Sequence, residues 1–220
     1  MKLSPNLKKF INNHSKLIDE NKFEELYRLP DIINITGLKA QFTQLLLEAK
    51  IPFLAYMRGL VSNMFSGTSL SITTLPSSVE IIGLHAFSGA DNIRTLVIPE
   101  TVTNIAAGAF IECANLTSID IKAPIEGLYV SCFKDCVKLS DVTLPNTIKR
   151  LGASVFRNCI SLKKITLPKS IEYISVSAFE GSGIETIIYE GSEDDFNKIS
   201  GSNYITSLPI SIVFQEIGRA

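Results

Sequence analysis

Residues 156–179 read FRNCISLKKITLPKSIEYISVSAF and contain one complete copy of a repeat. Phenylalanine marks the same point in every copy, at positions 65, 87, 110, 133, 156 and 179. The first step is 22 residues, and each of the later steps is 23 residues. Small or apolar residues recur at further fixed offsets from each phenylalanine, and chance does not produce so many coincident columns. Such self-similarity predicts that stacked copies of one structural unit form most of the chain.

Within one copy, the apolar residues indicate two sides of a flattened coil. Leu162, Ile165 and Leu167 follow a leucine-rich-repeat spacing, and their alternation places them on one face of a short strand. Pro168 then ends the strand, because proline cannot donate to a β ladder. A second apolar pair turns back along the other side, and Ala-Phe closes the coil. Coils stacked about 4.8 Å apart would make every column a ladder of like residues, with a phenylalanine spine inside.

The pattern resembles the BspA-like leucine-rich repeats, whose motif is Ala-Phe-x-x-Cys-x-x-Leu-x-x-Ile-x-Leu-Pro-x-x-Val-x-x-Ile. The resemblance covers about residues 63–200. Two copies depart from the motif: Lys122 replaces the proline, with Pro124 displaced, and the last copy is shortened at 181–183. The resemblance implies recognition of proteins or surfaces without catalysis, and it names no ligand. A helical leader before such repeats also looks like leucine-rich-repeat proteins encoded by phages.

The expected fold class is α+β, a leucine-rich-repeat solenoid of about five to six 23-residue coils with an N-terminal helical cap. Residues 1–62 are predicted to form the helical cap or attachment domain, 63–200 the solenoid and 201–220 a C-terminal capping strand. Ser4 and Pro5 are residue types typical of a helix N-cap and first helical position. Helical spacing predicts a first helix over 7–18, a second from 23 up to Pro30, a third over 38–49 and a fourth over 53–64.

The other end also departs from the repeat. Ser192, followed by the acidic residues 193–195, is typical of a helix N-cap with an acidic first turn. The acidic run lacks the alternating oxygen ligands and the glycine of a calcium loop, so capping explains it better. Apolar alternation over 210–214 predicts a closing strand. A solenoid needs atypical terminal units of this kind, because they cover its exposed core.

The composition excludes several classes of protein. The 220 residues are 45% apolar and 20% charged, which excludes a disordered chain. The net charge of −1 argues against a nucleic-acid partner, because dedicated nucleic-acid binders are normally basic. No apolar run approaches the roughly 18 residues of a membrane span, so no membrane insertion is expected. The N-terminus lacks the apolar run of an export signal. We therefore expect synthesis in the cytoplasm, with a virion left open as the destination.

Cysteine and histidine give no support for catalysis or metal binding. The 4 cysteines are too few for a disulfide scaffold. Cys113, Cys136 and Cys159 have the spacing of the repeat and lack the close pairs of zinc sites, so they are expected to be small buried residues. His14 and His85 have no recognisable Ser, Cys or acidic partner. The prediction is a non-enzymatic chain with no catalytic residue, no metal and no cofactor.

A basic stretch over residues 149–169, which contains no acidic residue, invites a polyanion-binding interpretation. The repeat columns instead place opposite charges on adjacent coils, where each pair contributes roughly 0.2–1 kcal/mol. The expected neighbours are Lys149 with Glu126 and Glu172, Lys164 with Asp141, Lys163 with Glu185, and Arg150 with Tyr173. A solvated, cross-paired surface is therefore the favoured interpretation.

The outward positions of the predicted strands form the candidate binding surface, because stacking fixes the backbone and leaves these positions free to vary. They are Thr95, Val97, Ser118, Asp120, Asp141, Thr143, Lys164 and Thr166. The predicted function is a non-enzymatic scaffold for protein–protein recognition, as a structural or accessory component of a larger assembly such as a phage particle. The alternative is a cell-surface adhesin or host-binding module.

Overall fold

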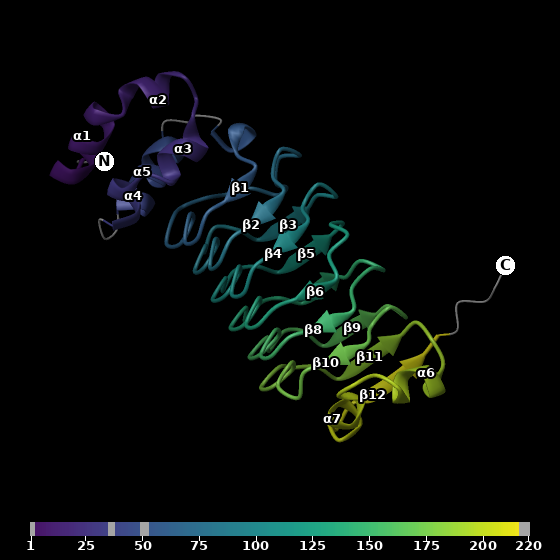
Figure 1. The fold of residues 1–220 in the computed structure, drawn as a ribbon. Helices are drawn as coiled ribbons and strands as arrows, with labels where there is room; N and C mark the ends of the chain where they lie inside the picture. The colour runs from purple at the N-terminus through teal and green to yellow at the C-terminus, as the bar shows by residue number, and fades with distance from the viewer. Residues whose placement is uncertain (1–2, 35–37, 49–52, 216–220) are drawn as a thin grey trace.

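The computed structural model describes residues 3–34, 38–48 and 53–215 of the chain. A helical unit lies at the N-terminal end, and stacked coils follow it along one axis to the C-terminal elements (Figure 1). The predicted α+β solenoid is therefore confirmed. It has about 7 coils where five to six were expected, because segments at both ends also join the stack.

The helical unit contains short helices that begin largely where the sequence predicted them. They are α1 Pro5–Asn13, α2 Ser15–Asp19, α3 Phe23–Tyr27, α4 Pro30–Asn34 and α5 Leu38–Glu48. Ser4 caps α1, since its hydroxyl accepts a hydrogen bond from the Leu7 N–H at 3.2 Å. The expected first helix is divided at His14, whose backbone leaves the helical conformation. Residue 49, the last of the expected third helix, lies outside the described residues.

The prediction of a fourth helix over residues 53–64 is wrong. Residues Phe53–Tyr56 form a 3-10 turn, and Gly59–Leu60 form strand β1, which pairs in parallel with β2 (Ile81–Ile82). The Glu80 N–H donates to Arg58 O, and the Gly83 N–H donates to Leu60 O, both at 2.7 Å. Pairing with the neighbouring coil outweighs the helical pattern here, because tertiary contacts override weak local preference. The repeat ladder therefore extends to residue 59, before the expected boundary at 62.

Each regular coil contributes one longer strand and one two-residue strand, on opposite sides of the stack. The side of the longer strands, called here the long-strand face, contains β3 Thr95–Ile98, β5 Ser118–Ile121, β7 Asp141–Thr143, β9 Lys164–Leu167, β11 Thr186–Tyr189 and β12 Ser211–Phe214. The other side, the short-strand face, contains β1, β2, β4 Asn104–Ile105, β6 Gly127–Leu128, β8 Arg150–Leu151 and β10 Tyr173–Ile174. All the strand pairs are parallel.

Each face is divided into two ladders. On the long-strand face, β3-β5-β7 form one sheet and β9-β11-β12 another. On the short-strand face, β1-β2-β4 form one sheet and β6-β8-β10 another. Among the described residues, no ladder pair joins β7 to β9 or β4 to β6. The two interruptions lie at different coil boundaries, and at each of them the ladder of the opposite face is continuous, through β3-β5 where β4 and β6 are not joined and through β8-β10 where β7 and β9 are not joined.

Stacked phenylalanine rings form the centre of the solenoid, as the sequence predicted. Neighbouring rings from Phe65 to Phe179 have centroids 5.0 to 5.7 Å apart and planes within 15° of parallel. All the rings in this column are buried. Phe53 contacts Phe65 at 6.2 Å and Phe23 of α3 at 6.0 Å, so the aromatic core continues into the helical unit. The helical unit and the solenoid therefore share one core.

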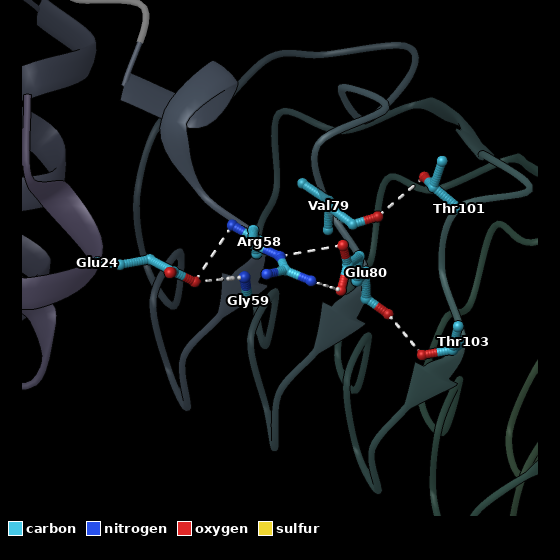
Figure 2. A network of polar contacts seen from close by, with 7 residues as sticks. All are labelled: Glu24, Arg58, Gly59, Val79, Glu80, Thr101 and Thr103. Carbon is cyan, nitrogen blue, oxygen red and sulfur yellow. Dashed lines mark hydrogen bonds and ion pairs between the residues drawn. The ribbon is translucent and has the colours of Figure 1, made fainter.

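The first coil has no preceding coil, and a glutamate side chain takes the place of the missing backbone acceptor (Figure 2). The N–H groups of Arg58 and Gly59 donate to Glu24 Oε1 at 3.2 and 2.8 Å. One coil later, the N–H groups of Glu80 and Ile81 donate in the same way to the carbonyl of Arg58. The Glu24 carboxylate thus ends the ladder as a carbonyl would, and protects an edge that could otherwise pair with another chain.

The C-terminal end is covered by two short helices and a strand, α6 Glu193–Asn197, α7 Ser202–Thr206 and β12. The Ser192 hydroxyl accepts the Asp195 N–H at 3.1 Å, which confirms the predicted cap. Strand β12 pairs with β11, which confirms the closing strand predicted over 210–214. The expectation of a strand for the whole segment 201–220 is wrong at its start, where α7 lies, and residues 216–220 lie outside the described residues. Ser200 extends the short-strand ladder, because its N–H donates to Glu172 O and its carbonyl accepts from Ile174 N–H.

The phenylalanine column predicts a large cost for truncating one ring. Phe133 is buried between Phe110 and Phe156, so Phe133→Ala should lower the free energy of unfolding by about 3–5 kcal/mol. Denaturant melts measure this loss. Ile160→Ala, which truncates an exposed side chain of a nearby turn, should stay within about 0.5 kcal/mol of wild type. A cost below about 1 kcal/mol for Phe133→Ala would show that the column is not what stabilises the stack.

The Glu24 contact predicts a local loss at the first coil. Glu24→Ala leaves two N–H groups without an acceptor and should cost roughly 1–3 kcal/mol. Hydrogen exchange at the Arg58 and Gly59 amides should accelerate. Glu24→Gln keeps a side-chain carbonyl and should retain most of the protection. Glu25→Ala, at the exposed neighbouring position, is the control. Unchanged exchange in Glu24→Ala would contradict the role assigned to this carboxylate.

Candidate functional site

The predicted binding residues all lie on the outer surface of the long-strand face. Thr95, Ser118 and Asp141 form one row across β3, β5 and β7. Val97, Asp120 and Thr143 form the second row, and Lys164 and Thr166 lie at the matching outward positions of β9. The side chains are small or paired among themselves, as in the hydrogen bond from the Ser118 hydroxyl to Asp141 at 3.3 Å. Their role in binding stays a prediction.

The short-strand face carries larger apolar side chains that are open to solvent. They are Ile81, Leu84, Tyr129, Val130, Tyr173 and Val176, with exposed fractions of 42% to 68%. This set is called here the short-strand patch. It includes a column in which large residues alternate with alanine, from Leu84 through Ala107, Val130 and Ala153 to Val176. Exposed apolar patches on a folded protein mark interaction sites.

A groove of about 450 Å³ lies on the same face, over the boundary between β4 and β6. Polar, charged and aromatic residues of four successive coils line it, together with Gly127: Thr103, Asn104, Glu126, Tyr129, Lys149, Arg150 and Tyr173. Gly127 has no side chain at an outward position that holds Asn104 in the coil before and Arg150 in the coil after, and this leaves room for the groove. This hollow, called here the short-strand groove, was not predicted.

Pro124 explains why the stack opens at this boundary. In other coils the same column holds a hydroxyl that donates to a carbonyl of the preceding coil: Ser78 to Leu54, Thr101 to Val79, Thr147 to Ile125 and Ser170 to Ile148. Proline has no hydroxyl and cannot make this contact. The displaced proline that breaks the repeat motif therefore removes one link between coils.

Backbone links are missing at the same boundary. The Thr103 N–H donates to Glu80 O, and the Lys149 N–H donates to Glu126 O, both at 2.8 Å. Within the described part of the chain, the Glu126 N–H of this column has no acceptor, and neither does the Tyr129 N–H three residues later. Two amide donors are consequently left unpaired beside the short-strand groove.

The expected charge pairing is confirmed for two lysines. Lys149 pairs with Glu126 at 2.9 Å, and Lys163 pairs with Glu185 at 2.8 Å. The hydrogen bond between Lys149 and Glu126 raises the pKa of the lysine and lowers the pKa of the glutamate. Both groups therefore stay charged at neutral pH.

Two other expected contacts in the basic stretch have different outcomes. Arg150 lies directly opposite Tyr173 in the ladder, as predicted. Lys164 makes no ion pair with Asp141 among the described residues, because β7 and β9 are not joined by a ladder. Asp141 instead accepts the hydroxyl of Ser118. Within the basic stretch over residues 149–169, every basic residue except Lys164 and Arg150 thus has an ion pair in the described structure.

The cysteines are buried and unbridged, as the column predicted. Cys113, Cys136 and Cys159 each donate their thiol to the carbonyl of a spine phenylalanine, at 3.0 to 3.1 Å. Burial raises the pKa of the Cys159 thiol to about 12, and it also raises the pKa of Cys132 and Cys136. Cys132, Cys136 and Cys159 are therefore neutral packing groups. Among the described residues, no group of three or more His, Cys, Asp and Glu side chains is placed to hold a metal ion.

The histidines lie apart from each other and from the groove. His14 is half-buried, and its ring centroid lies 4.9 Å from that of Phe10. Its Nε2 lies 3.5 Å from Asp31 Oδ2, an acidic partner that the sequence did not reveal. His85 lies in a turn with φ of 54° and covers Gly108. No described helix is both long and apolar enough to cross a lipid bilayer.

The parallel ladders, the 23-residue coils and the phenylalanine column define a leucine-rich-repeat solenoid. The family model described as "BspA type Leucine rich repeat region", which comprises six copies of the repeat, matches residues 58–185 and 126–217. The chain therefore belongs to the BspA-type leucine-rich-repeat family. No curated protein matches the chain.

Solved structures show the same fold. A leucine-rich-repeat protein from Eubacterium ventriosum is 30% identical, with a TM-score of 0.50, and the match covers 59% of this chain and 42% of that one. The Treponema protein described as "T. pallidum Leucine Rich Repeat protein" is 24% identical, with a TM-score of 0.53, and the match covers 60% and 64%. This chain spans less than two thirds of the length of either protein.

The thiol column predicts a large difference in reactivity between the folded and unfolded protein. A thiol reagent at pH 8 should modify almost none of the 4 cysteines in the native protein and all of them after unfolding. Ser140→Cys, at an exposed position, should add one rapidly reacting thiol and so report on reagent access. Rapid native labelling of the wild type, or a mass lower by a pair of hydrogens, would contradict buried free thiols.

Proposed function

We propose that this chain is a non-enzymatic scaffold for protein–protein recognition, which binds a partner through the short-strand face. The observation that carries this proposal is the short-strand patch, whose apolar side chains are exposed although the core beneath them is complete. Stacking of the coils fixes the spacing of these side chains, so binding does not require them to be ordered first. Preorganisation of this kind improves affinity, because less conformational entropy is lost on association.

The finer proposal is a structural or accessory component of a larger assembly, such as a phage particle. Such a component must contact more than one neighbour. The short-strand patch lies on the solenoid, whereas exposed Ile33 lies on α4 of the helical unit at the other end of the shared core. Exposed apolar side chains on both the solenoid and the helical unit support a joining role. The alternative, a cell-surface adhesin or host-binding module, requires only the solenoid surface.

Co-purification tests both levels of the proposal. The tagged protein should co-purify with a defined assembly from its native source and should not bind intact cells. Leu84→Asp with Val176→Asp should reduce capture at least about tenfold, because desolvating a carboxylate against an apolar partner is costly.

The matched control changes the other face. Thr95→Asp with Thr143→Asp adds the same charges at exposed positions of the long-strand face and should leave capture unchanged. If this variant loses capture while Leu84→Asp with Val176→Asp keeps it, the partner binds the long-strand face predicted from the sequence. Binding to cells without any assembly would favour the adhesin alternative.

A further inference from the structure

We propose that the short-strand groove binds a carboxylate side chain of an extended acidic peptide segment, with Arg150 as the charged contact. This inference rests on the proposed protein-recognition function and specifies the chemistry of the partner. Its basis is a set of hydrogen-bond donors that belong to residues lining one groove and have no acceptor in the described part of the chain.

The first donor is the guanidinium of Arg150. In the described part of the chain this exposed side chain has no ion-pair or hydrogen-bond partner, whereas the neighbouring Lys149 is paired with Glu126. Among the charged lining residues, Glu126 offsets one of the two positive charges of Lys149 and Arg150, so the lining retains a net positive charge. Arginine binds carboxylates through two parallel hydrogen bonds, which gives it both strength and geometric selectivity.

The other donors are the unpaired N–H groups of Glu126 and Tyr129. They are free because Pro124 and the interrupted ladder leave no carbonyl of the preceding coil within reach. Because Glu126 and Tyr129 are exposed, water serves these N–H groups in the free protein, and an acceptor on a ligand would take the place of that water. A bound carboxylate, or the carbonyl groups of an extended peptide beside it, supplies such acceptors.

Tyrosine rings explain why the ligand should be a peptide segment and not an isolated anion. Tyr129 and Tyr173 are 55% and 42% exposed and lie along the groove with Arg150. Tyrosine offers a large contact area with little loss of conformational freedom. An apolar residue next to the carboxylate would pack on these rings, so the preferred motif combines an acidic and an apolar side chain.

A substitution at Gly127 can fill the groove without disturbing the fold. The backbone at this position does not require glycine, and an added Cβ would meet Arg150 at an ordinary contact distance of 3.7 Å. Gly127→Asn with Pro124→Thr would give this coil the side chains that the preceding coil carries at the same positions, Asn104 and Thr101. The double variant should fill the groove and restore the missing link between coils.

The test uses a random heptapeptide display library selected on the full-length protein. Enriched peptides should carry Asp or Glu beside an apolar residue. A synthetic enriched peptide should bind at least about tenfold more tightly than its Gln or Asn isostere, and the affinity should fall with added salt. Arg150→Ala should weaken binding by a similar factor. Arg94→Ala, at an exposed position preceding the long-strand β3, should have no effect.

The outcomes separate this inference from the proposed function. Enrichment of neutral peptides, or equal binding to Arg150→Ala, overturns the acidic specificity, while capture of a protein partner through the short-strand patch would still stand. Binding to Gly127→Asn/Pro124→Thr that equals wild type also overturns it, provided that melts show this variant to be folded. Tight binding of hyaluronate, used as an acidic polysaccharide probe, with no enriched peptide, overturns the peptide assignment.

Discussion

Hydrogen bonds between successive coils are the constraint on which the rest of the structure depends. A parallel ladder satisfies the backbone of a coil only if the next coil repeats its path, one strand spacing away. Every residue is therefore surrounded by the residues one repeat before and after it. This is why phenylalanine stacks on phenylalanine, and why each thiol of the cysteine column reaches a phenylalanine carbonyl. The same rule explains the ends, where Glu24 and Ser200 provide the groups that a further coil would have supplied.

A single interruption of this rule creates the most distinctive surface of the molecule. Pro124 removes a hydroxyl link, two backbone donors lose their acceptors, and Gly127 leaves an outward position empty. None of these changes affects the buried column, because Phe110 and Phe133 remain stacked at 5.3 Å across the same boundary. The core and the surface of one coil boundary are thus independent. A repeat protein can change its ligand chemistry in this way without losing its scaffold.

The buried columns could be predicted from the sequence because they obey one periodicity. The phenylalanine spine, the cysteine column and the pairing of Lys149 with Glu126 follow directly from residues spaced by 23. The stretch at 53–64 was assigned wrongly, since its apolar residues fit helical spacing while its pairing with β2 depends on a distant segment. The division of the first helix at His14 likewise has no strong signal in the sequence.

The short-strand groove could not be predicted for a different reason. Its signal, the displaced proline, is visible in the sequence as a departure from the motif. Its effect depends on knowing that the hydroxyls of Thr101 and Thr147 tie neighbouring coils together, and that contact exists only in the folded stack. Exposure of Leu84 and Val176 is similarly hidden, because an apolar residue in a repeat is expected to face the core.

The two interrupted ladders also affect how the whole molecule can deform. The coils between them, containing β5 to β8, keep a strand ladder to the N-terminal coils on the long-strand face alone and to the C-terminal coils on the short-strand face alone. Hydrogen bonds at the turns, such as Phe110 N–H to Cys132 O and Phe156 N–H to Ala178 O, still cross both boundaries. The edges without a ladder therefore lie on opposite faces of the stack. Bending that separates these edges would widen the groove at the first boundary and spread β7 from β9 at the second. A ligand in the groove would resist the first of these deformations and so bear on the curvature of the stack.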